Sequence, residues 1–286
     1  MADMRQTEIK ELSHLLSERA LTGETMLLNM GPQHPATHGV LRVLVELDGE
    51  TIVNAIPDIG FLHTGVEKNM EAKTYQKAEV MTDRLDYMNP IGNNLVYSLA
   101  VEKLIDLDVP PRAQAIRVIL AELTRLSSHL LWLGTSGLDV GALTPFLYTM
   151  REREMLLDIF ELCSGARMMT TYIRPGGVWR DVPVEFEKAV GEFLAAQRRR
   201  IDQYEALLTG NEIFLERTVN VGTITREQCI EMGLTGPFLR ATGLAHDLRK
   251  IQPYSGYEQY DFDIPTATGG DVFSRYKVRV EEVRQS

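Results

Sequence analysis

The segment PPRAQAIRVILAELTRLSSHLLWL at residues 110–133 predicts a long α-helix, and this helix decides the fold class. Its two leading prolines suit a first helical turn, and no proline follows within the segment. Three further helices are predicted on similar start and stop signals, at Asn89–Asp108, from Thr144-Pro145 to near Ser164-Gly165, and at about Val184–Leu208. Long helices joined by short links indicate a helical bundle.

A β-rich region precedes these helices. The loop GPQHPATHG at 31–39 leads into VLRVLVEL at 40–47, and the turn signal Asp48-Gly49 joins that strand to TIVNAI at 51–56. The loop therefore runs directly into a hairpin, which can hold it rigidly.

These patterns predict an α+β fold that is mainly α, with a small β-hairpin region packed on a long helical bundle. We expect three parts: an amphipathic N-terminal extension at 1–24, a β-rich region at 25–62 and a helical bundle region at 63–286. In the extension, the apolar residues at 7–17 share one helical stripe, formed by Ile9, Leu12, Leu15 and Leu16.

The last part of the chain predicts another helix. Asp271 has the character of an N-cap, and the apolar residues after it fall on one helical face, namely Val272, Tyr276, Val280 and Val283. The pattern reaches Ser286 without a stop signal, which favours a fragment of a longer protein that is truncated at its C-terminus.

Composition and charge exclude several classes of protein. The 286 residues carry a net charge of −10, which argues against nonspecific nucleic-acid binding and against attachment to anionic lipid. Two cysteines are too few for a disulfide framework or for ligating an iron–sulfur cluster alone. The N-terminus lacks the apolar core of a secretory signal, and the most apolar stretch, 129–150, is broken by Asp139, glycines and Pro145. We therefore expect a cytosolic chain that meets a membrane through partners.

Two loop segments carry candidate functional side chains. His34 and His38 stand in the loop at 31–39, where Pro35 makes a helical metal-ligand pair improbable. Residue chemistry favours a solvated turn there, and the alternative is a histidine-bearing tip that reaches into a pocket. In TDRLDYMNP at 82–90, Arg84 and Tyr87 are explained either by ordinary helix-terminal polarity or by a phenol donor with positive charge nearby.

Two further places hold polar groups at informative positions. Glu122, Arg125 and His129 share one helical face, which indicates either a surface stripe of ion pairs or a buried polar face turned toward a charged partner. Asp139 stands among Gly, Leu, Val and Ala, where it is either an exposed loop carboxylate or a buried one that needs a partner such as histidine. Neither Gly176-Gly177 nor any other glycine pair matches a nucleotide-binding loop.

The ordered motifs resemble a known family. They run along the chain as MGPQHPATHGVLR (30–42), HTGVEK (63–68), YQKAEVMTDRLDY (75–87), YSLAVEKL (97–104), PPRAQAIRVILAELTRLSSHL (110–130), LDVGALTPF (138–146), YIRPGGV (172–178), LRKIQPYSGYE (248–258) and GDVFSRYKVRVEEVRQS (270–286). Together they closely resemble the quinone-site subunit of respiratory complex I, the 49 kDa-type or D subunit of NADH–quinone oxidoreductase. The resemblance covers nearly the whole chain from about residue 25.

The resemblance implies a fold like the large subunit of nickel–iron hydrogenases. Those enzymes bind their metals through two CxxC pairs, whereas the position that resembles the first pair reads DRLDY here, without cysteine. The resemblance therefore implies a metal-free cavity that is used for quinone, which excludes a hydrogenase large subunit.

The resemblance also implies residue roles. His38 and Tyr87 would donate hydrogen bonds to the two carbonyls of the quinone headgroup, where reduction adds two electrons and two protons. Asp139 would pair with His38 and favour its imidazolium form, and His34 would be a second histidine at the quinone. Arg84 and His129 would face the terminal iron–sulfur cluster of the neighbouring small subunit and tune its potential.

Cofactors and partners follow from the same resemblance. Quinone would be the substrate, this chain alone would bind no metal or nucleotide, and electrons would come from NADH through FMN and iron–sulfur clusters on partner subunits. The expected partners are the small subunit with the terminal cluster, the 30 kDa-type (C) subunit and the membrane arm, at the cytoplasmic side of a bacterial plasma membrane. The alternatives are a related complex with another electron donor, such as a ferredoxin-fed or hydrogenase-related one, and a non-catalytic scaffold.

Overall fold

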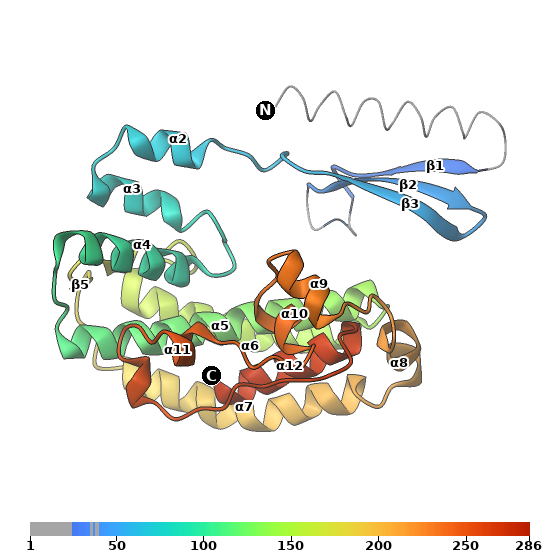
Figure 1. Cartoon of the computed structure of the whole chain (residues 1–286). Coiled ribbons are helices and arrows are strands. Elements are labelled where there is room, and N and C mark those ends of the chain that lie inside the picture. Colours follow the sequence, from blue (N-terminus) through green and yellow to red (C-terminus); the bar gives the residue numbers. More distant parts are fainter. Residues whose placement is uncertain (1–24, 35–36, 38–39) are drawn as a thin grey trace. The chain divides into compact units, whose positions relative to one another are not determined.

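The computed structural model describes residues 25–34, 37 and 40–286. The amphipathic helix predicted at 7–17 and the side chain of His38 lie outside the described residues. The chain divides into two compact units, Met1–Asn69 and Met70–Ser286. The first contains a small antiparallel sheet and the second is almost entirely helical, which confirms the mainly helical α+β class (Figure 1). The three-part division at 24/25 and 62/63 stays a prediction.

The sheet of the first unit has three antiparallel strands in the order β1 (Met26–Met30), β2 (Arg42–Asp48) and β3 (Thr51–Asp58). The predicted hairpin is confirmed, because Asp48 pairs with Thr51 across a two-residue turn. Gly49 takes a φ of +60° in that turn, a conformation that glycine adopts without steric cost.

The loop before β2 is fixed to the sheet by a close backbone approach. Gly31 has a φ of +95°, and a Cβ atom placed on it would lie 2.2 Å from the carbonyl oxygen of Leu41. Further along, the backbone N–H and the hydroxyl of Thr37 both donate to the carbonyl of His34, at 3.0 and 2.9 Å. The described part of this loop is therefore turned and anchored, as its position beside the hairpin predicted.

Two short helices, α2 (Val66–Glu71) and α3 (Tyr75–Thr82), precede the bundle. The bundle itself consists of long helices whose bounds are α4 Pro90–Ile105, α5 Pro111–Asp139, α6 Leu143–Ser164, α7 Phe186–Leu208 and α12 Val272–Gln285. The sequence predicted all of them, and the largest difference is at the end of α5, which was expected at Leu133 and continues to Asp139. Proline begins α4 and α5 near the first turn, and Gly165 ends α6 in the left-handed conformation, as the sequence signals require.

The core of the second unit lies where these helices pack together. Helix α5 packs against α6, α6 packs against α7, and α12 lies on α5 and α7 (Figure 1). Fully buried side chains from each helix meet there, including Leu120, Leu130, Leu156, Phe193 and Tyr276.

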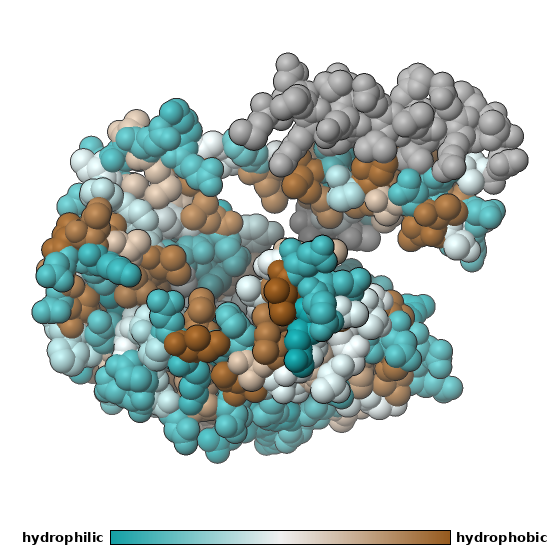
Figure 2. Space-filling view, in the orientation of Figure 1, coloured by the Kyte–Doolittle hydropathy of each residue, from teal (hydrophilic) through white to brown (hydrophobic). Residues whose placement is uncertain are grey.

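On the face shown in Figure 2, hydrophilic side chains predominate and apolar ones form scattered patches. No helix in the described ranges is both long and apolar enough to cross a membrane.

A buried ion pair ties a small hairpin to the bundle. This hairpin consists of β4 (Ile173–Arg174) and β5 (Gly177–Val178). The fully buried guanidinium of Arg117 binds both carboxylate oxygens of Glu102 and donates to the carbonyls of the hairpin residues Arg174 and Gly177. Both charges are thus paired, which removes the cost of leaving either one alone in the interior.

The region between α7 and α12 contains short helices that the sequence patterns did not predict. Their bounds are α8 Glu212–Thr218, α9 Arg226–Glu231, α10 Gly236–Arg240, α11 Leu248–Ile251 and the 3₁₀ helix η2 Tyr257–Gln259. Each is too short to show a clear apolar period, so its local sequence carries little signal. Several begin with a side-chain cap instead, such as Thr225, which forms a capping box with Gln228.

Helix α12 begins as predicted at Asp271. Its carboxylate accepts hydrogen bonds from the N–H groups of Ser274, at 2.7 Å, and of Asn220, at 2.8 Å. Because both donors would lose their acceptor, Asp271→Ala should lower the free energy of unfolding by about 1–2 kcal/mol. Urea unfolding of the purified chain measures this loss. The exposed Asp263→Ala serves as a control, and an equal change in both variants would show that Asp271 does not act as a cap.

Candidate functional site

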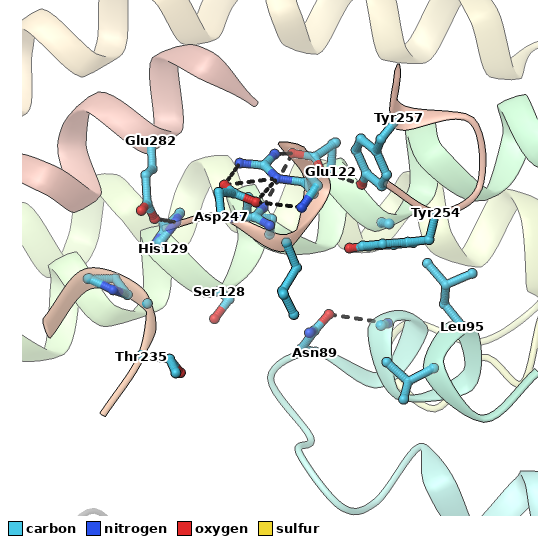
Figure 3. A pocket seen from close by; sticks show the side chains of 18 of the residues that line it. Asn89, Leu95, Glu122, Ser128, His129, Thr235, Asp247, Tyr254, Tyr257 and Glu282 are labelled. Atoms are coloured by element: carbon cyan, nitrogen blue, oxygen red, sulfur yellow. Dashed lines mark hydrogen bonds and ion pairs between the residues drawn. The ribbon is translucent and has the colours of Figure 1, made fainter. Parts of the chain in front are cut away.

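A cavity of about 440 Å³ opens within the helical unit, between α4, α5, α10, α11 and the end of α12 (Figure 3). Most of the residues that line it have polar or charged side chains. Those that carry the argument are Asp86, Asn89, Glu122, Arg125, His129, Arg240, Asp247, Arg249, Tyr257 and Glu282. They come from parts of the chain as distant as Asp86 and Glu282, so the fold assembles a site that no single motif reveals.

The polar face of α5 lines this cavity. Glu122, Arg125 and His129 all lie on it, and Arg125 Nε is 3.3 Å from Glu122 Oε2. The ion pair predicted for a surface stripe is therefore present, but the face that carries it is mostly buried and bonds to residues more than 100 positions away. Periodicity placed these three residues on one face and could not indicate what covers them.

Arg249 of α11 is the centre of one half of the cavity. Its buried guanidinium donates to Asp247 through Nε and Nη2 and to Glu122 Oε2 through Nη1, at 3.0 Å. The hydroxyl of Tyr257 donates to the other oxygen of Glu122. Burial opposes ionisation of Asp247, but the hydrogen bonds and charge of Arg249 outweigh it and lower the pKa of that carboxyl. Burial also raises the pKa of Tyr257, so its phenol keeps its proton.

His129 is the centre of the other half. Its Nε2 atom lies 2.9 Å from Oε2 of Glu282, whose other oxygen accepts from Arg240 Nε at 2.8 Å. Burial opposes ionisation of Glu282, yet His129 and Arg240 outweigh it and lower the pKa of this carboxyl to about 2. Burial lowers the pKa of His129 more than Glu282 raises it, with Arg125 and Arg279 adding to the decrease. The imidazole is thus neutral at pH 7.

The lowered pKa of His129 gives a stability prediction with a definite sign. Below the ordinary pKa of histidine, about 6.5, the unfolded chain takes up a proton at this residue that the folded chain does not. Stability therefore falls as pH falls from 7 to 5.5. We expect His129→Gln to weaken this fall by about 1 kcal/mol in urea unfolding, whereas the exposed His63→Gln should not. Identical pH profiles for wild type and His129→Gln would contradict the lowered pKa.

The segment that carries Arg84 and Tyr87 connects α3 to α4. Arg84 is exposed, and its Nη1 donates to the carbonyl of Val80 at 2.6 Å. The side chain of Tyr87 is 47% exposed, and its hydroxyl forms no hydrogen bond within the described part of the chain. Two other residues of this segment, Asp86 and Asn89, line the cavity that contains His129. Figure 3 shows Asn89 facing the cavity across from Ser128 and His129.

The remaining predicted site residues are Asp139, His34 and His38. Asp139 is exposed, as the first of its two interpretations expected, but it is the last residue of α5 and not a loop residue. His34 is an exposed loop residue of the first unit. His38, the predicted partner of Asp139, lies outside the described residues, so this pairing and the shared contact with Tyr87 stay predictions.

Sequence reasoning missed Glu282, Arg240 and Arg249 as members of the site. Glu282 lies on α12, a helix that was predicted from its apolar residues alone. Its carboxylate is almost fully buried, and a buried carboxylate requires a cation or hydrogen-bond donors as partners. Within the described ranges, no group of three or more His, Cys, Asp or Glu side chains could hold a metal ion.

The comparisons with known proteins agree on one family. The family model described as respiratory-chain NADH dehydrogenase, 49 Kd subunit, matches residues 139–286. A D-type subunit of the NADH-quinone oxidoreductase of Chloroflexus aurantiacus is 60% identical over 271 residues, which are 94% of this chain and 66% of that protein.

Two further relatives carry the same name. The D-type subunit of Roseiflexus castenholzii is 61% identical over 95% of this chain and 66% of its own length. The one of Koribacter versatilis is 52% identical over the whole chain and 69% of its own length. The chain thus spans about two thirds of the length of these relatives. It belongs to the family of the 49 kDa subunit of the respiratory-chain NADH dehydrogenase.

Proposed function

We propose that this chain is the D subunit of a proton-translocating NADH–quinone oxidoreductase and forms its quinone-reduction site with partner subunits. Membership of the family supports this proposal, because the relatives are named for that reaction. The observation that carries it is the common cavity, which Asp86 and Asn89, from the segment that bears Arg84 and Tyr87, line together with the hydrogen-bonded pair of His129 and Glu282. The segment with the proposed proton donor thus adjoins the cavity that contains a titratable imidazole.

Tyr87 has the properties of a donor to substrate. Its phenol is half-exposed and has no acceptor among the described residues, so a carbonyl oxygen of quinone can accept its proton in a hydrogen bond. In the proposal His38 binds the opposite carbonyl, Asp139 stabilises the charged form of His38, and His34 assists on the same loop. Donors at both oxygens stabilise the negative charge that develops as electrons arrive.

His129 and Arg84 are proposed to face the terminal iron–sulfur cluster of the small subunit. This cluster and FMN, both on partner subunits, supply electrons from NADH one at a time. A neutral imidazole held at 2.9 Å from the carboxylate of Glu282 can take a proton when negative charge appears nearby. Its protonation then compensates that charge and makes the potential of the neighbouring centre depend on pH.

The wider arrangement follows the family. We propose that the chain lies peripherally at the cytoplasmic side of a bacterial plasma membrane and contacts the small subunit, the 30 kDa-type subunit and the membrane arm. We also propose that its two units are arranged as in the hydrogenase large subunit, with the hairpin region packed on the bundle and the quinone cavity in place of the metal site.

A gene deletion tests the proposed function. Membranes from a strain without this gene should lose NADH–quinone reduction, while NADH oxidation by an artificial acceptor at the flavin persists in the remaining subunits. The intact gene should restore the quinone activity. If quinone reduction from reduced ferredoxin is lost instead, the chain serves a related complex with another donor. If no quinone reduction is lost, it is a scaffold and the proposal is wrong.

A further inference from the structure

Two buried carboxyl groups lie at the end of α3, directly before the segment that carries Tyr87. Glu79 is 2% exposed and Asp83 is fully buried, whereas the next residues, beginning with Arg84, are exposed. Neither carboxyl forms an ion pair with a cation in the described ranges. Buried carboxylates without a cation are costly, so a proton or a strong set of donors must stabilise them.

Asp83 has donors for one of its two oxygens. The hydroxyl of Thr171 donates to Oδ2 at 2.5 Å, and Thr171 is held at a φ of +41° beside it. Positive φ is rare and strained for a β-branched residue, so the surrounding structure must enforce this contact. The other oxygen, Oδ1, is buried and has no hydrogen-bond partner.

Asn94 of α4 also lies close to Asp83. Its side chain favours the ionised carboxyl and lowers the pKa of Asp83, against the larger effect of burial, and it donates through Nδ2 to the hydroxyl of Thr82 at 2.9 Å. Thr82 in turn gives its only hydroxyl proton to the carbonyl of Glu79, at 2.7 Å, so it must accept from Asn94. This chain fixes the amide orientation and leaves Oδ1 of Asn94 as a second buried acceptor without a donor.

One proton on the Asp83 carboxyl removes the buried charge and turns one of its oxygens into a donor, close to an amide whose Oδ1 lacks a donor. We propose that Asp83 and Glu79 form a buried proton-binding pair, which holds one exchangeable proton at neutral pH and stores it behind the Tyr87 segment. The use of this proton in quinone reduction rests on the proposed function.

The charges around the pair oppose a bound proton, but burial outweighs them. The titratable and charged side chains that face it from the surrounding elements are Tyr75, Arg84, Tyr97, Glu102, Arg117 and Arg174. Arg117 is bound to Glu102, and Arg84 and Arg174 donate to backbone carbonyls, so none of the three binds either carboxyl. Burial raises the pKa of Asp83 and raises that of Glu79 to about 7.

The stored proton has a route to solvent. Glu79 lines an open cavity of about 510 Å³ together with Thr171 and Arg174. Ser98 donates its hydroxyl proton to Glu79 Oε1 at 3.0 Å, which holds the carboxyl in place at the cavity wall. Quinone takes two electrons and two protons to become quinol. The pair would supply one of these protons toward the Tyr87 segment and would be refilled from water in this cavity.

Infrared difference spectroscopy of the purified complex tests for the bound proton. At pH 6.5 the wild type should show the carbonyl band of a buried carboxylic acid, which the double variant Asp83→Asn/Glu79→Gln lacks. Glu216→Gln, an exposed change elsewhere on the chain, should keep the band. If wild type and double variant do not differ in this band, the pair is ionised and the proposal is overturned.

Urea unfolding gives a second, independent test for the bound proton. When a carboxyl has a higher pKa in the folded chain than in the unfolded chain, the folded chain keeps a proton that the unfolded chain releases. The midpoint of urea unfolding of the wild type should therefore rise as the pH is lowered from 8 to 6.5. The double variant should lose this rise. Asp83→Asn should fold, because an amide replaces a protonated acid nearly isosterically, and failure to fold counts against the proposal.

The rates of quinone reduction in two variants distinguish a failure of the proton-binding pair from a failure of the proposed quinone site. Glu79→Gln should slow quinone reduction about 10-fold and flatten its pH profile around pH 7. An unchanged rate and profile, with Tyr87→Phe inactive, would overturn the proton store and leave the quinone site intact. Full activity of Tyr87→Phe would count against the quinone site instead, and the infrared band would then decide on the proton-binding pair alone.

Discussion

Tyr87→Phe in the assembled complex should slow quinone reduction by about 100-fold while the terminal iron–sulfur cluster is still reduced by NADH. A positioned proton donor contributes about 10²–10⁴-fold to a reaction that takes up protons, and phenylalanine removes only the hydroxyl. Because Tyr87 is half-exposed and its hydroxyl has no partner among the described residues, the change should leave the fold unaltered. Quinone kinetics and the paramagnetic resonance of the cluster measure the two effects separately.

The matched control is Tyr260→Phe, which removes the hydroxyl of a tyrosine that is exposed to a similar degree and lies outside the proposed quinone site and the proton-binding pair. It should leave quinone reduction within about twofold of wild type. Unchanged kinetics in Tyr87→Phe would remove this residue from the quinone site. Loss of cluster reduction would instead show that Tyr87 acts on the electron-transfer side or on assembly.

Arg249→Met should destabilise the helical unit by about 3–5 kcal/mol. Methionine keeps much of the side-chain volume but leaves Asp247 and Glu122 buried without their guanidinium, and breaking a buried ion pair on one side has this cost. The midpoint of urea unfolding at pH 7 measures the loss.

Arg167→Met provides the control for Arg249→Met. Arg167 also contacts two carboxylates, Glu154 and Asp158, but all three side chains are substantially exposed. Water screens such pairs, so the control should change stability by about 1 kcal/mol or less. Equal losses in both variants would show that burial of the Arg249 network contributes nothing beyond a surface ion pair.

The long helices could be predicted because their signals are local. Prolines at the start of α5, Gly165 after α6 and the N-cap Asp271 each act within one turn, so the sequence alone places those ends. The hairpin was predictable for the same reason, since its turn spans two residues. Elements of four to seven residues between α7 and α12 have no such period and could not be predicted.

The site was predictable only in part, because its contacts are long-range. One helical face gave Glu122, Arg125 and His129, but no local pattern connects His129 to Glu282 or Glu122 to Arg249. Those pairs exist because α11 and α12 cover α5 in the folded unit. The resemblance to a family supplied roles for Tyr87 and Asp139 that their surroundings alone do not, since both side chains are exposed.

The position of quinone in a structure of the assembled complex is the decisive measurement. We expect the headgroup to lie between His38 and Tyr87, with one carbonyl oxygen within hydrogen-bonding distance of the imidazole and the other within that distance of the phenol. A headgroup bound elsewhere, or these two side chains directed into separate and unconnected regions, would contradict it.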